Sequence, residues 1–146
     1  MDFDAYWKRL VDRVYKEKEE LTGPDAVFYR LTSIRGETMV GGMESYFERR
    51  HEEFEADMQL LEELGFSDLA KDFRDARTVM FGNKALSREE MEEIHMQFLE
   101  EDPSLEAAQN QINAIYRRVI EKIDALDDYR MDYGVKNGLF VAAGES

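Results

Sequence analysis

The sequence contains no cysteine, which excludes a disulfide framework, a thiolate zinc site and a cysteine nucleophile. It contains only two prolines, Pro24 and Pro103, so few positions interrupt a long helix. It also lacks a run of about 18 apolar residues, and it therefore offers no candidate for a transmembrane helix. The first residues are acidic and have no apolar stretch, so we expect no signal peptide and a cytoplasmic location.

Basic residues are scarce relative to acidic ones. The chain has 19 Lys and Arg against 33 Asp and Glu, which gives a formal net charge of −14 at pH 7. Binding of nucleic acid or of an anionic membrane would need a strong basic patch. The sequence has only short basic runs, such as Arg49-Arg50 and Arg117-Arg118. We therefore expect neither direct nucleic-acid binding nor membrane binding.

The apolar residues that are present follow a helical period. Hydrophobic residues make up 43% of the 146 residues and aromatic residues 12%, which is too much for a disordered chain. We expect an all-α fold, a compact single-domain bundle of about six to eight short and medium helices over residues 1–146. The expected helices cover approximately residues 4–20, 24–40, 43–50, 52–64, 68–81, 87–101 and 105–126, with a last short helix after residue 127.

Local signals mark several helix ends. The pair Gly41-Gly42 permits a left-handed turn or a close approach between helices, so it predicts a break. Ser87 followed by Glu90 is a capping-box signature for the helix that starts there. In that helix we expect Met91, Ile94, Phe98 and Leu99 to point inward.

The acidic residues are concentrated in two segments. Residues 52–63 contain six acids and residues 89–106 contain eight, and neither segment contains Lys or Arg. Helical spacing places most of these acids opposite the apolar side of each helix. The glutamates expected to form two faces without compensating bases are Glu52, Glu55, Glu62, Glu63, Glu89, Glu92, Glu93 and Glu100. Such faces either attract a basic protein or serve only as solvated surface.

The two histidines each follow a glutamate by three residues, as Glu48 and His51 and as Glu92 and His95. Two such pairs with two further glutamates build the di-iron site of some four-helix bundles. Glutamate is abundant in this chain, however, and no additional glutamate stands alone within an apolar helix face. The sequence also has no nucleophile elbow and no phosphate-binding loop. We therefore expect no catalytic residue, no metal and no cofactor, and a metal-dependent enzyme remains the weaker alternative.

Residues 37–47, Glu-Thr-Met-Val-Gly-Gly-Met-Glu-Ser-Tyr-Phe, resemble the Glu-x-x-x-Asn-Gly-Gly-Phe-x-x-Phe/Tyr-Phe signature of the bacterial helical family of DNA mimic protein 19. The similarity extends over about residues 26–133. The resemblance marks Glu37, Gly41, Gly42, Tyr46 and Phe47 as a structural motif. It implies an all-helical fold, with a tight helix junction at the glycines and with the aromatic pair as a core anchor. It further implies kinship with an acidic, dimeric member that binds a transcription factor in place of DNA.

Two interpretations of function follow. The first is an acidic protein-binding module, in its specific form a DNA mimic, whose eight glutamates contact the basic surface of a DNA-binding protein. The second is a small helical interaction or assembly protein whose acidity only aids solubility. Its partner surface would be an exposed apolar patch near Tyr129, Tyr133 and Phe140. A homodimer would extend an acidic strip, and the oligomeric state stays open.

Overall fold

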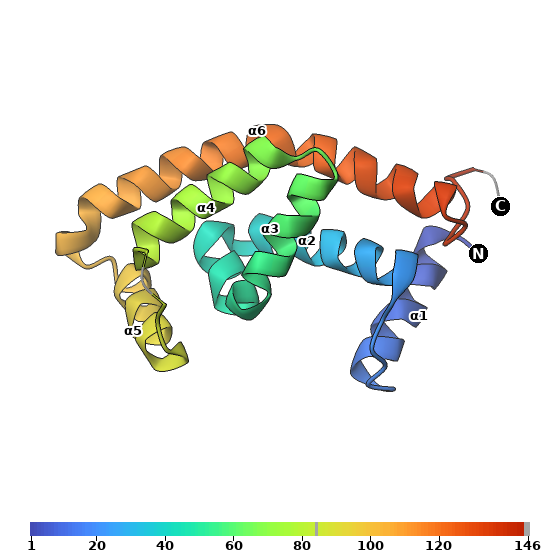
Figure 1. The fold of residues 1–146 in the computed structure, drawn as a ribbon, viewed down its shortest axis with the longest axis horizontal. Helices are drawn as coiled ribbons and strands as arrows, with labels where there is room; N and C mark the ends of the chain where they lie inside the picture. Colours follow the sequence, from blue (N-terminus) through green and yellow to red (C-terminus); the bar gives the residue numbers. More distant parts are fainter. Residues whose placement is uncertain (84, 145–146) are drawn as a thin grey trace. The chain divides into compact units, whose positions relative to one another are not determined.

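The computed structural model describes residues 1–83 and 85–144, and these residues form helices and no strand. The elements are α1 (Phe3–Tyr15), α2 (Gly23–Arg50), the 3-10 helix η1 (His51–Glu53), α3 (Phe54–Glu63), α4 (Ser67–Phe81), α5 (Arg88–Leu99), the 3-10 helix η2 (Pro103–Leu105) and α6 (Glu106–Lys136) (Figure 1). The expected all-α fold is confirmed. None of the described helices combines the length and the apolar character that crossing a membrane requires.

The chain divides into two compact units. One consists of Met1–Ser33 and Ala125–Ser146, and the other of Ile34–Asp124. We refer to them as the terminal unit and the central unit. The helices α2 and α6 each contribute residues to both units. The single domain expected over residues 1–146 stays a prediction.

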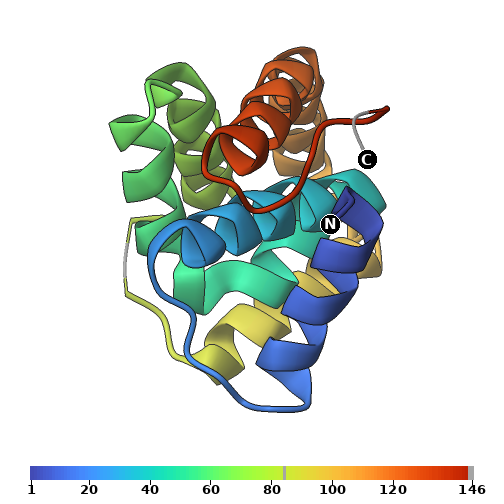
Figure 2. The same cartoon turned by 90° about the vertical axis from the view of Figure 1, so that its right-hand side faces the viewer.

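An aromatic cluster forms the core of the terminal unit. Tyr6 and Leu10 from α1 are buried with Phe28 from α2 and with Phe140, which follows α6. The rings of Phe28 and Phe140 meet edge to face, with centroids 5.4 Å apart. Figures 1 and 2 show how the segment after α6 (red) returns toward α1 and the first turns of α2 (blue). Helical periodicity cannot predict which segments of the chain contact each other, so this cluster could not be predicted from the sequence.

The first helix ends earlier than expected. Its start is capped by Asp2, whose carboxylate accepts a hydrogen bond from the N–H of Ala5 at 2.8 Å. The expected end was near residue 20, but α1 ends at Tyr15. The backbone of Lys18 takes a left-handed conformation, with φ at 52°, and the Arg13 side chain then binds the carboxylate of Glu19. Residues 16–20 are good helix formers, but the ion pair between Arg13 and Glu19 holds them in a turn after the helix.

The glycine pair breaks α2 where the sequence predicts a break. Gly41 has φ −147° and ψ 19°, and Gly42 has φ 76° and ψ −158°, so neither residue is helical. A Cβ atom on Gly41 would lie 2.7 Å from the Cβ of Ser45. Gly42 occupies a region of backbone space that side chains disfavour. The segment of α2 after the kink therefore takes a direction of its own toward residue 50.

The last helix is longer than expected. The prediction ended it at residue 126 and started a new short helix, but α6 continues to Lys136. Asp127 does not stop it, because its carboxylate accepts from Arg130 one turn later, with Nη2 and Oδ1 2.7 Å apart. Gly134 is tolerated within the helix because the Phe140 ring lies against it. A Cβ atom there would come within 2.2 Å of that ring.

The central unit has a separate core. Its large buried side chains include Met43, Tyr46, Phe47, Phe54, Met58, Leu61, Phe73, Ile112, Val119 and Ile123. The helix α4 packs against both α3 and α5. On α5 the expectation for Phe98 is confirmed, whereas the expectation for Leu99 is wrong, because that side chain is 57% exposed. His95 is buried in its place, which shifts the inner face of α5 toward residues 95 and 98.

Candidate protein-binding surface

We use the name acidic surface for the eight glutamates that the sequence predicts as partner contacts. All eight are exposed, and all belong to the central unit. Glu52 lies in η1, three lie in α3, three lie in α5, and Glu100 caps the C-terminus of α5. Exposure follows from helix geometry, because Phe54, Leu61 and Phe98 occupy the opposite, buried sides of these helices. The glutamates are thus placed to meet a partner.

Two of the glutamates on α3 share an arginine from another helix. Arg74 of α4 places Nη1 3.3 Å from Oε2 of Glu55, and Nη2 3.1 Å from Oε1 of Glu62. The carboxylates lie two turns apart on α3, and the guanidinium group bridges them. All three side chains are partly or largely exposed, so the pairing adds little stability. It does fix the spacing of two carboxylates.

A second arginine joins the two acidic segments. Arg88, the first residue of α5, places Nε 3.3 Å from Oε1 of Glu92 and Nη1 3.8 Å from Oε1 of Glu52. The faces of η1 and α5 therefore adjoin at this guanidinium group. The expectation that both faces lack compensating bases is wrong, because Arg74 reaches α3 from α4 and Arg88 directly precedes the second acidic segment.

The remaining four glutamates of the acidic surface have no cationic partner among the described residues. They are Glu63, Glu89, Glu93 and Glu100. Glu63 accepts only a neutral hydrogen bond from the amide of Gln59 at 3.2 Å. These four carboxylates are therefore available to pair with an external cation.

The start of α5 is fixed by the capping box that the sequence predicts. The Ser87 hydroxyl accepts from the N–H of Glu90 at 3.1 Å, and the Glu90 carboxylate accepts from the N–H of Ser87 at 3.1 Å. The box satisfies two helix N–H groups and fixes where the helix begins. Glu89, Glu92 and Glu93 then follow on its solvent side.

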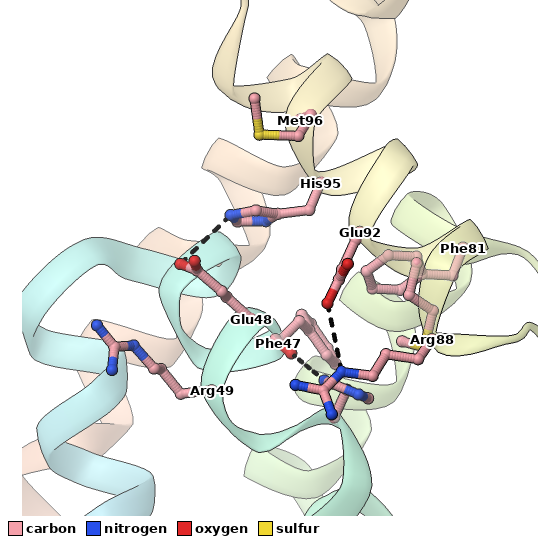
Figure 3. A pocket seen from close by; sticks show the side chains of 10 residues that line it. Phe47, Glu48, Arg49, Phe81, Arg88, Glu92, His95 and Met96 are labelled. Carbon is pink, nitrogen blue, oxygen red and sulfur yellow. Dashed lines mark hydrogen bonds and ion pairs between the residues drawn. The ribbon is translucent and has the colours of Figure 1, made fainter.

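A pocket of about 410 Å³ lies beside the acidic surface, between the last turns of α2 and the outer part of α5 (Figure 3). Its volume falls in the range of small-ligand pockets, about 300–1,000 Å³. It is lined by Phe47, Glu48, Arg49, His51, Phe81, Arg88, Met91, Glu92, His95 and Met96. The lining combines apolar walls with several charged or polar groups.

Both Glu-x-x-His pairs of the sequence contribute to this pocket, although they do not form a metal site. Oε2 of Glu48 lies 3.4 Å from Nε2 of His95, whereas Glu92 turns to Arg88. Nδ1 of His51 lies 3.2 Å from the carbonyl oxygen of Phe47. Within residues 1–83 and 85–144, no three His, Asp or Glu side chains are grouped so that they could hold a metal ion. The metal-dependent enzyme therefore gains no support from the geometry.

His95 is a buried polar side chain of this pocket whose ring nitrogens lack hydrogen bonds. It is only 7% exposed, and neither ring nitrogen has a hydrogen-bond partner among the described residues. Oε2 of Glu48 lies 3.4 Å from Nε2 of His95, but the contact does not have hydrogen-bond geometry. Buried polar groups are normally paired, so an orphaned imidazole beside a pocket points to a missing partner.

Asp57 belongs to one of the acidic segments but does not reach the surface. It is fully buried, and its carboxylate accepts from the Tyr46 hydroxyl at 2.7 Å and from Arg50 at 2.7 and 2.8 Å. Burial lowers the pKa of Arg50, but the hydrogen bonds to Asp57 outweigh it and the net pKa is raised. The sequence contained a signal for this burial, because Asp57 lies three residues after Phe54 and four before Leu61. This network ties the end of α2 to α3.

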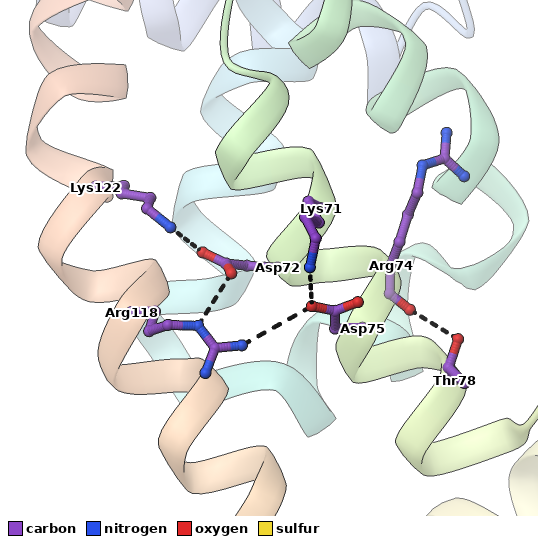
Figure 4. Close-up of polar contacts among 7 residues, drawn as sticks. All are labelled: Lys71, Asp72, Arg74, Asp75, Thr78, Arg118 and Lys122. Carbon is purple, nitrogen blue, oxygen red and sulfur yellow. Dashed lines mark hydrogen bonds and ion pairs between the residues drawn. The ribbon is translucent and has the colours of Figure 1, made fainter.

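A second buried carboxylate ties α4 to α6. Asp72 accepts from Lys122 and from Arg118, whose Nε lies 3.2 Å away (Figure 4). Arg118 also reaches Asp75 at 3.9 Å, and Asp75 pairs with Lys71 at 3.0 Å. Arg118 and Lys122 of α6 therefore connect that helix to α4. The sequence reading missed this role, because the partners are distant in the chain.

The aromatic patch expected on the terminal unit is only partly exposed. Tyr129 and Tyr133 are half-buried and stack on each other, with ring centroids 6.1 Å apart. Phe140 was expected at the surface, but it is only 4% exposed because it completes the core with Phe28. The prediction is wrong for Phe140.

The residues of the structural motif lie in the central unit. Tyr46 and Phe47 are buried, and Glu37 is half-buried.

Comparison with known proteins agrees with the sequence resemblance. No curated protein and no solved structure matches the chain. The model of the family described as DMP19-like protein matches residues 19–134, which include the glycine kink, the acidic surface and the pocket. The match covers most of the chain, and the chain therefore belongs to the DMP19-like protein family.

Proposed function

We propose that this protein is an acidic protein-binding module that takes the place of DNA on the basic surface of a DNA-binding protein. The observation that carries the proposal is the exposure of all eight glutamates on one unit, with the two acidic segments joined where Glu52 and Glu92 meet Arg88. Membership of the DMP19-like family supports the same function, because the resemblance implies kinship with a DNA mimic.

The chemistry of the contact follows from the free carboxylates. Glu63, Glu89, Glu93 and Glu100 can each accept charge-assisted hydrogen bonds from Lys or Arg of the partner. The net charge of −14 steers a basic surface toward the protein before contact. The module acts by occupying a site, and it needs no catalytic group, no cofactor and no direct contact with nucleic acid. A homodimer, which would lengthen the acidic surface, belongs to this proposal.

The proposal is tested by capture from a lysate of the source organism. The full-length protein is immobilised, bound proteins are eluted with a salt gradient, and each is identified by mass spectrometry. We expect a DNA-binding protein to elute at moderate salt, since exposed charge pairs are screened. Its own operator duplex should displace it at low salt, whereas a duplex of scrambled sequence should displace it less.

A matched pair of variants separates the acidic surface from charge in general. The test variant carries Glu63→Gln, Glu89→Gln, Glu93→Gln and Glu100→Gln. The control variant removes the same charge from exposed acids of the terminal unit through Asp4→Asn, Glu17→Gln, Glu20→Gln and Asp132→Asn. We expect the test variant to lose the partner and the control to keep it. Equal retention by both variants would contradict the proposal and favour a helical interaction protein whose acidity only aids solubility.

A further inference from the structure

The pocket beside the acidic surface contains groups whose placement the fold does not explain. We infer that this pocket receives one arginine side chain of the basic partner. The inference rests on the proposed function and adds to it a specific anchor point, because a general acidic surface attracts many basic proteins whereas a fitted pocket selects one side chain. The evidence comes from His95, from Glu48 and from the apolar walls.

His95 supplies the first argument. Its ring is buried at the edge of the pocket, and both of its nitrogens lack hydrogen-bond partners among the described residues. A neutral imidazole ring offers one acceptor nitrogen, and leaving it unpaired in a buried position is costly. A guanidinium N–H that enters the pocket would satisfy that nitrogen.

Glu48 supplies the second argument. Its carboxylate points to the His95 ring, and no Lys or Arg of the described residues pairs with it (Figure 3). Glu92, the other carboxylate of the lining, is instead engaged by Arg88. In Figure 3 the Arg49 side chain extends to the left of Glu48, away from the His95 ring, and no dashed line joins it to Glu48. The pocket thus offers one carboxylate without a cationic partner, next to an unpaired imidazole.

The walls supply the third argument. Phe47 and Phe81 are nearly buried beneath the pocket, and Met91 and Met96 line its α5 side. Arginine has an apolar stem that packs on such walls, and its planar head stacks well on aromatic rings. The rigid fork of five N–H donors can reach Glu48 and His95 together, which the point charge of lysine does less well. An anionic ligand would meet the carboxylate of Glu48.

The experiment uses an arginine probe and the full-length protein. The probe is Nα-acetyl-L-arginine amide, and its uncharged analogue Nα-acetyl-L-citrulline amide is the control at the same ionic strength. The chain has two histidines, so the ring signals of His95 are assigned by NMR with a His51→Gln variant. We expect the arginine probe to shift the His95 ring signals saturably, and the citrulline probe to leave them nearly unchanged.

Two variants test the role of the carboxylate. Glu48→Gln removes its charge at constant size and should weaken binding of the arginine probe by about tenfold. Glu121→Gln changes an exposed glutamate of α6 that belongs neither to the pocket lining nor to the acidic surface, and it should leave binding unchanged. An equal response to citrulline, a saturable shift by inorganic phosphate in place of arginine, or unchanged binding by Glu48→Gln would overturn the inference. Because the probe replaces the partner, this result is independent of the lysate capture, and the two proposals can fail separately.

Discussion

Glu52 and Glu92 come from different acidic segments of the chain, and their carboxylates meet at the guanidinium group of Arg88. Without that arginine the two like charges would repel each other across the junction of η1 and α5. The arginine therefore allows a denser arrangement of carboxylates than repulsion alone would permit. Its positive charge also reduces the negative charge of the acidic surface by one unit, and this reduction can be measured.

Replacement of Arg88 by Gln should strengthen the field of the acidic surface. Arg9→Gln makes the same change of net charge in the terminal unit, where Arg9 is exposed. We expect Arg88→Gln to elute later than Arg9→Gln from an anion-exchange column, because retention reports local charge density as well as net charge. Thermal stability should change little, by about 0.5 kcal/mol or less, since the pairs are exposed. Coelution of the two variants would argue against a locally dense surface.

Replacement of Asp57 by Asn should destabilise the central unit strongly. The change leaves the charge of Arg50 without its carboxylate in a site where that side chain is 12% exposed. Breaking a buried pair in this way typically costs about 3–5 kcal/mol. Urea unfolding followed by circular dichroism measures the loss. Glu63→Gln, an exposed change on the same helix, should stay within about 0.5 kcal/mol and serves as the control.

The kink of α2 predicts opposite effects for two glycines of the same helix. Gly42→Ala forces a side chain into a backbone conformation that only glycine adopts easily, at a cost of about 1–3 kcal/mol. Gly36 is helical and a Cβ atom there meets nothing within 4 Å, so Gly36→Ala should stabilise by about 0.4–1 kcal/mol. Melting temperatures of both variants test the pair. A harmless Gly42→Ala would show that the kink is not required.

Asp25 should make the terminal unit sensitive to acid. Burial raises the pKa of Asp25, but hydrogen bonds from Tyr6 at 2.7 Å and Arg13 at 2.9 Å outweigh it, so the net pKa lies below its ordinary value. A lowered pKa means that the folded state favours the ionised form. The stabilisation is therefore present above the unfolded pKa of about 3.9, and it is lost as the pH falls through the lowered value.

The pH dependence is measured as a difference between variants. Urea unfolding of the wild type and of Asp25→Asn at pH 7, 5 and 3 should give a gap in unfolding free energy that shrinks toward acid. Asp4→Asn, an exposed change on α1, should give no such trend. A gap that stays constant from pH 7 to 3 would rule out the proposed role of the Asp25 carboxylate.

The sequence predicted those parts of the fold that depend on neighbouring residues. The capping box at Ser87 and the break at Gly41-Gly42 are local, and both are found. The ends of α1 and α6 were misplaced because they depend on contacts made after folding. The ion pair between Arg13 and Glu19 forms directly after α1 ends. The Phe140 ring packs against Gly134 in the part of α6 that extends beyond the predicted end.

For the candidate site, too, the sequence predicted the features that depend on neighbouring residues and missed those that depend on contacts between helices. Helical spacing was enough to place the eight glutamates on the exposed side. It could not show that Arg74 of α4 bridges Glu55 and Glu62, because counting within a segment ignores neighbouring helices. Nor could it show that Glu48 and His95 line one pocket, since that requires knowing that α5 packs beside the end of α2.

The two bridging arginines also determine how many mobile cations the acidic surface holds. On DNA every phosphate carries condensed counterions, and each one that a protein displaces steepens the salt dependence of binding. On this surface Arg74 and Arg88 already occupy Glu55, Glu62, Glu92 and Glu52, so these carboxylates have few sodium ions to release. A partner that binds both DNA and this protein should therefore show a shallower plot of log K against log salt with the protein. The slope of that plot for the complex with this protein should reflect the number of unpaired carboxylates in the contact. The protein would then compete better against DNA at physiological ionic strength than at low salt.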